Sequence, residues 1–184
     1  MQDARYYHHP DERSFDATVT GCRDYKDGLF AVTLSDTLFY PEGGGQPGDT
    51  GTLSGVRVTD TRLSGDEIIH VCEAELPVGQ TVHGELDWER RFRHMQCHTG
   101  EHIFSGIAHE LYGCNNVGFH LSRDCVTIDF DRVLTAEQLA EVERQTNEAV
   151  FADVPTVISY PDADTLHTLD YRSKKELTGT VRIV

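Results

Sequence analysis

A single stretch with helical periodicity divides this sequence into two parts of different character. The periodicity begins near Leu86 and runs to about Tyr112, and Gly113 follows where a helix commonly ends. Apolar side chains recur along one face of the stretch, at Met95, Ile103, Phe104, Ile107 and Leu111. This spacing is typical of a helix that packs one side against a core. We therefore expect one long helix between two separately patterned regions.

The region before the helix has the pattern of an all-β fold. Residues 15–20, 29–34, 67–72 and 81–87 are short segments that alternate or are rich in β-branched side chains, and Gly, Asp or Pro bounds them. Several strands at this spacing predict a small barrel or sandwich over residues 1–88.

The second region, residues 89–184, mixes helical and strand patterns. Thr135 and Gln138 have the spacing of a capping box, which predicts a second helix after them. Strands are predicted at 117–122, 125–130, 156–160 and from 180 onward. The sequence therefore predicts an α+β fold in which helices pack on one face of an antiparallel sheet.

The charge of the chain limits its partners. With 31 acidic and 16 basic residues the formal net charge is −15, whereas proteins that grip long stretches of phosphate backbone are basic on at least one face. A general nucleic-acid binder is therefore excluded. The local basic run Arg90-Arg-Phe-Arg93 fits contact with a few phosphates, although such a run is more often a solvated face.

The cysteines and the N-terminus indicate a compartment. The five cysteines form no Cys-x-x-Cys pair, which favours a reducing cytoplasm over a disulfide framework. No apolar run is long enough to span a bilayer, and residues 1–5 lack the apolar centre of a signal peptide. We expect a cytoplasmic protein without a membrane partner.

A histidine pair lies on the long helix. His98 and His102 are four residues apart, so they stack on one helical face about a turn apart. Two imidazoles in this arrangement can hold one divalent metal, usually zinc. The same spacing also occurs on ordinary polar helix faces, and both interpretations stay open at this point.

A glycine-rich loop precedes the helix. Three consecutive glycines, Gly43, Gly44 and Gly45, stand before Gln46 and allow backbone angles that other residues avoid. One interpretation is a turn between strands, and the other is a loop whose N–H groups and Gln46 amide contact a ligand or the neighbouring domain. The phosphate-loop pattern is absent because no Gly-Lys-Ser/Thr follows.

Together these motifs resemble one family. The chain contains, in the family's order, Phe39-Tyr-Pro-Glu-Gly-Gly-Gly-Gln46, Asp87-Trp-Glu-Arg-Arg91 and His98-Thr-Gly-Glu-His102. It resembles the free-standing alanyl-tRNA editing proteins (the AlaX group), which are akin to the editing domain of alanyl-tRNA synthetase. The resemblance implies a small β-barrel at 1–88 followed by an editing domain at 89–184. It also implies hydrolysis of seryl- or glycyl-tRNA(Ala) as a trans-editing activity in translation, with the acceptor end of the tRNA as partner.

The resemblance also implies a zinc cofactor and a set of site residues. The family's zinc site combines an H-x-x-x-H pair, matched here by His98 and His102, with a later Cys-x-x-x-His. No cysteine in this sequence has a histidine four residues after it, so we expect either a chain truncated before that motif or a diverged, metal-poor member, with two of the four ligands. The other expected site residues are Thr99, Glu101 and Gln46 as catalytic groups, and Gly43, Gly44, Gly45, Gln46 and Arg91 as the substrate loop and its surroundings.

Two alternative functions remain at this point. One is a non-catalytic module that binds tRNA or a protein, since half of the ligand set is missing. The other is a metallopeptidase, because His98-Thr-Gly-Glu-His102 also satisfies H-x-x-E-H. In that case Glu101 would be the general base and Glu176 the third ligand.

Overall fold

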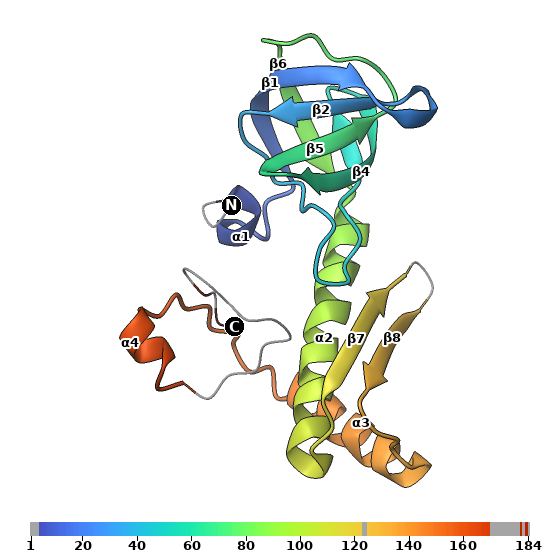
Figure 1. Ribbon diagram of the computed structural model, residues 1–184, viewed down its shortest axis with the longest axis vertical. Coiled ribbons are helices and arrows are strands. Elements are labelled where there is room, and N and C mark those ends of the chain that lie inside the picture. The colour runs from blue at the N-terminus through green and yellow to red at the C-terminus, as the bar shows by residue number, and fades with distance from the viewer. Residues whose placement is uncertain (1–3, 123–124, 170–180, 182, 184) are drawn as a thin grey trace. The chain divides into compact units, whose positions relative to one another are not determined.

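The computed structural model describes residues 4–122, 125–169, 181 and 183 (Figure 1). The chain folds as two compact units. The first comprises Met1–Thr99 and Gly118–Ile128, and the second comprises Gly100–Val117 and Asp129–Val184. The predicted domain division after residue 88 stays a prediction.

Six antiparallel strands of the first unit form a closed barrel, as Figure 1 shows. The strands are β1 (Ser14–Asp24), β2 (Phe30–Leu34), β3 (Gly51–Leu53), β4 (Val56–Ser64), β5 (Glu67–Cys72) and β6 (Thr81–Leu86). Their order around the barrel is β1-β2-β5-β4-β3-β6. Closure pairs every strand on both sides and so removes the exposed edges of an open sheet.

Alternating burial along the strands builds the barrel core. In β1, Phe15, Ala17 and Val19 are buried while their neighbours face outward. Gly84 of β6 lies opposite Phe15, and a Cβ at this glycine would lie 2.4 Å from the Phe15 ring. Phe39, from the segment that leads into the glycine loop, is fully buried in the same core. The core therefore fixes the start of that loop.

The remaining elements are mostly helical. Helix α2 spans Trp88–Tyr112, α3 spans Ala136–Phe151, and β7 (Asn116–Leu121) and β8 (Val126–Phe130) form a two-stranded sheet. Short helical segments occupy Arg5–His8 (α1), Lys26–Gly28 (η1) and Ala163–Leu166 (α4). In the second unit, a small core is built from Ala108, Cys114 and Val142, with Phe104, Ile107, Tyr112, Phe130 and Leu134 packed against it.

Most of the predicted architecture is confirmed. The α+β class, the N-terminal barrel and the long helix are present, and Thr135 and Gln138 form the expected capping box at the start of α3. Strands β3 and β4 were not predicted. The prediction of a strand at 156–160 is wrong, because within the described part of the chain Ser159 makes only one isolated bridge, to Ile183.

Two further predictions, of unpaired cysteines and of no membrane-spanning segment, can be compared with the described residues. All five cysteines are free thiols. Among the helices of the described ranges, none is long and apolar enough to cross a membrane.

Candidate active site

The glycine loop is a tight turn that requires its glycines. The backbones of Gly43 and Gln46 exchange hydrogen bonds of 3.1 and 3.0 Å. Between them, Gly44 and Gly45 have φ values of 61° and 83°, in the left-handed region that side chains with a Cβ disfavour. The turn therefore presents Gln46 at a fixed position.

The loop is held against residues 118–121 of strand β7, which belong to the same compact unit. The Gly45 carbonyl accepts a hydrogen bond of 3.1 Å from the Leu121 N–H. A Cβ on Gly45 would lie 2.3 Å from the carbonyl oxygen of Phe119, closer than any real contact. Glycine at this position thus permits the close approach of two backbones.

Gln46 reaches from this loop to the first histidine of the pair. Its side chain is buried, and its Oε1 lies 3.1 Å from His98 Nδ1. Because an amide oxygen only accepts, His98 Nδ1 carries the proton and Nε2 carries the lone pair. The His98 ring also stacks on Phe119, with centroids 5.1 Å apart and planes inclined by 27°. Two contacts thus fix the tautomer and the orientation of the ring.

His98, Glu101 and His102 on α2 form a possible metal-binding group. Their ligand atoms all lie within 4.8 Å of one another. Glu101 is buried, whereas the His102 side chain is 70% exposed. The sequence prediction gave Glu101 a catalytic role and did not place it among the ligands.

Two polar side chains hold the Glu101 carboxylate. Its Oε1 accepts hydrogen bonds from Ser105 Oγ, at 2.7 Å, and from Asn116 Nδ2. Its Oε2 lies 3.8 Å from His102 Nδ1. One oxygen is therefore anchored while the other faces the histidine. Ser105, one turn after Glu101, was recognisable from its i,i+4 spacing, but Asn116 lies beyond the helix and gave no such signal.

Two other predicted site residues lie apart from these contacts. Arg91 is buried and forms an ion pair with the buried Asp49, and its Nη1 also donates to the Leu38 carbonyl at 3.3 Å. Burial raises the pKa of the Asp49 carboxyl, and the positive charge of the neighbouring Arg91 partly offsets this rise. Arg91 thus anchors α2 to the chain on both sides of the loop, at Leu38 before it and at Asp49 after it. Thr99 follows His98 on the helix and is exposed.

Known proteins match this chain over most of its length. A family model described as class II tRNA synthetases (A) matches residues 3–90. The chain is 37% identical over 169 residues to the alanyl-tRNA editing protein AlaX-L of Pyrococcus horikoshii, covering 88% of this chain and 42% of that protein.

It is 33% identical over 187 residues to the alanyl-tRNA editing protein Aarsd1 of Danio rerio, covering 94% of this chain and 45% of that protein. The chain is a relative of the alanyl-tRNA editing proteins. An alanine–tRNA ligase of Thermococcus kodakarensis is also similar, with 39% identity over 156 residues, 79% of this chain and 16% of the ligase. The chain spans less than half the length of the two editing proteins.

Proposed function

We propose that this relative of the alanyl-tRNA editing proteins hydrolyses the ester that joins serine or glycine to tRNA(Ala). The observation that carries the proposal is the hydrogen bond between Gln46 and His98. It joins the two motifs of the sequence that an editing site needs, the glycine loop and the H-x-x-x-H pair. The names of the curated relatives support the same activity.

We further propose that zinc binds to His98, His102 and Glu101. Two imidazoles and one carboxylate are a donor set of known catalytic zinc sites, and the three ligand atoms lie close enough together to share an ion. Because His98 Nδ1–H donates its hydrogen bond to Gln46 Oε1, the His98 atom left to bind the metal is Nε2. When bound, zinc supplies Lewis-acid polarisation of an ester carbonyl or of a water molecule.

The chain's own side chains position the substrate in this proposal. Gln46 holds the His98 ring in one orientation from the loop side, and the loop's backbone closes the site against β7. Thr99, exposed beside His98, contacts the hydroxyl of a seryl group. Replacing Thr99 with Val should therefore reduce the preference for seryl-tRNA over glycyl-tRNA, as measured by the ratio of kcat/KM values.

The central test is deacylation of seryl-tRNA(Ala) with and without zinc. We expect His98→Ala to abolish zinc-dependent hydrolysis. His83→Ala, which replaces an exposed barrel histidine paired with Asp16, is the matched control and should retain activity. Hydrolysis that ignores both zinc and His98 contradicts the metal assignment. An inactive wild-type chain that still binds the tRNA would identify a non-catalytic module instead.

A second variant separates two roles for Glu101. Glu101→Gln keeps the size of the side chain and an oxygen that can accept from Ser105. If Glu101 is a ligand, as we propose, the zinc content of the purified variant falls together with its activity. If zinc content is unchanged and only kcat falls, Glu101 is the general base that the sequence predicted.

A further inference from the structure

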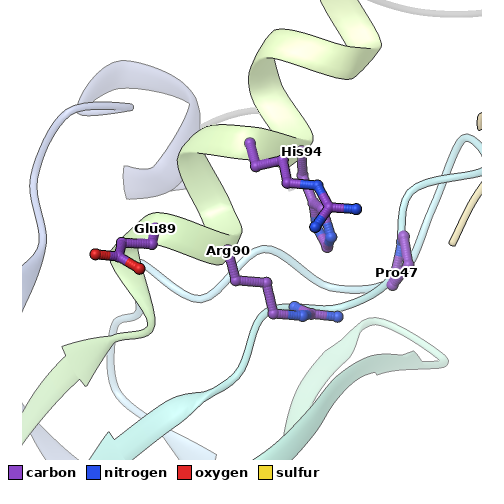
Figure 2. Close-up of a pocket in the computed structure, with 5 residues that line it drawn as sticks. Pro47, Glu89, Arg90 and His94 are labelled. Carbon is purple, nitrogen blue, oxygen red and sulfur yellow. The ribbon is translucent and has the colours of Figure 1, made fainter. Parts of the chain in front are cut away.

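A basic hollow lies at the start of α2, within the first compact unit. Its volume is about 420 Å³, and its lining residues are Pro47, Glu89, Arg90, Arg93 and His94. Figure 2 shows Arg90 and His94 extending towards the side where Pro47 lies, while Glu89 points the opposite way. The Glu89 carboxylate therefore points away from the Arg90 and His94 side chains.

One ring nitrogen of His94, a residue that lines this hollow, has no hydrogen-bond partner among the described residues. The residue is only 4% exposed, and this nitrogen is its Nδ1. Leaving a buried polar atom unpaired costs about 1–3 kcal/mol, and the residue that carries this nitrogen is one of those that line the hollow. Burial, followed by the charges of Arg90, Arg93 and Arg91, lowers the pKa of His94 to about 4. A neutral ring among cations can still donate one hydrogen bond.

The electrostatics of the hollow favour an anion. Arg90 Nη1 donates a hydrogen bond to the Gly48 carbonyl at 2.8 Å, which holds the guanidinium in place. The group has five N–H donors, so others remain for a ligand. Arg93, which also lines the hollow, is exposed. The N-terminus of α2, a helix of 25 residues, adds the positive end of its dipole. These groups form a concentrated cationic spot in a chain with a net charge of −15.

The hollow adjoins the candidate active site along the chain. Pro47 directly follows Gln46, and His94 precedes His98 by four residues, which is about 6 Å along a helix axis. We propose that the hollow binds a backbone phosphate of the RNA whose 3′-terminal ester lies at His98. This inference rests on the proposed function and specifies which residues bind the RNA strand. In an acidic protein, such a local contact supplies attraction that the overall charge does not.

The test compares two serine esters that differ in phosphate. One is an RNA hairpin that ends in the single-stranded 3′ end of tRNA(Ala), and the other is seryl-adenosine, which has no phosphate. For each enzyme, we take the ratio of kcat/KM for the hairpin to kcat/KM for the nucleoside. Arg93→Gln removes one charge from the hollow at an exposed side chain, and urea unfolding of the variant checks that it folds like the wild type. Arg23→Gln, at an exposed arginine of β1 that lies 3.9 Å from Glu67, is the control.

We expect the ratio to fall on the order of tenfold in Arg93→Gln, the effect of one hydrogen bond to a charged group. Arg23→Gln should keep the wild-type ratio. An unchanged ratio in Arg93→Gln, or an equal fall in both variants, overturns the proposal.

A separate measurement keeps the two proposals distinguishable. If the wild type hydrolyses neither ester, the proposed function fails, and binding of the uncharged hairpin tests the hollow alone. The slope of log affinity against log salt concentration should then be smaller in Arg93→Gln by about 0.7, the value for one phosphate of a single strand. Equal slopes for the wild type and Arg93→Gln would overturn the phosphate assignment.

Discussion

The orientation of one histidine ring, His98, depends on residues far away in the sequence. Its partners are Gln46, 52 positions earlier, and Phe119 on β7. The sequence predicted His98 and His102 from their spacing, because an i,i+4 pair is a local property of a helix. It could not predict which ring nitrogen faces the loop, since that depends on tertiary contacts.

Removing the Gln46 acceptor should weaken the site without changing its volume. Gln46→Leu leaves the His98 Nδ1–H without its partner, and loss of such a hydrogen bond to a metal-binding histidine typically costs 10–100-fold in affinity or activity. We expect zinc affinity, measured by chelator competition, and kcat to fall within that range. Gln80→Leu, at an exposed barrel glutamine, is the control. Unchanged zinc affinity and rate in Gln46→Leu would remove the loop from the site.

A second histidine, His70, should make folding stability depend on pH. It is fully buried, with Nδ1 3.0 Å from the Val32 carbonyl and Nε2 2.8 Å from Thr37 Oγ1, and burial lowers its pKa to about 4. Between pH 6.5 and about 4, the unfolded chain binds a proton that the folded chain does not. The free energy of unfolding should therefore decrease over this window as pH falls, by on the order of 3 kcal/mol in total.

Urea unfolding at several pH values checks this dependence. His70→Gln should lose stability less steeply than the wild type over the window. Val71→Ala, a core substitution beside His70 that removes no titrating group, should lower stability while keeping the wild-type pH dependence. An equally steep decrease in His70→Gln would show that other groups cause it.

Among the helices and strands, the sequence predicted those whose pattern lies within the element itself. The capping box of Thr135 and Gln138 and the long apolar periodicity of α2 are both local in sequence, and both helices form. Strand β3 has only three residues and begins with glycine, and β4 carries Arg57, Asp60 and Arg62 among its apolar positions. Their pairing with each other and with β5 and β6 is decided by barrel closure, which no short segment encodes.

The contact between the glycine loop and β7 predicts a large cost for a single methyl group. Gly45→Ala combines an unfavourable φ of 83° with a Cβ that would lie 2.3 Å from the Phe119 carbonyl oxygen. Gly55 separates the two effects, because its φ is 85° and no atom of the residues that the structure describes comes within 4 Å of its Cβ position, its chain neighbours aside. Gly55→Ala should thus cost only about 1 kcal/mol of stability for the backbone angle.

Gly45→Ala should cost about 2–4 kcal/mol, since overpacking adds roughly 1–3 kcal/mol to the backbone term. It should also lower the deacylation rate, because the loop that carries Gln46 must move. Urea midpoints and seryl-tRNA hydrolysis measure the two effects. Equal costs for both substitutions would mean that the loop does not depend on close contact with β7.

At the scale of the whole molecule, charge limits how the substrate can be held. The net charge of −15 repels the phosphate backbone of RNA at long range, and the basic residues at the start of α2 precede His98 on the same helix. The rest of the tRNA therefore has little to gain from contact with this chain. Catalysis should depend on the acceptor end alone.

This argument predicts that a hairpin copying the acceptor end serves nearly as well as the complete tRNA(Ala). We expect their kcat/KM values for seryl-ester hydrolysis to agree within about threefold, because contacts beyond the acceptor end add no favourable electrostatic energy. Raising the salt concentration should weaken both substrates in parallel, since both would make the same few phosphate contacts. A complete tRNA that is preferred more than tenfold, with a steeper salt dependence, would instead mean that the chain carries a second RNA-binding surface outside the hollow at the start of α2.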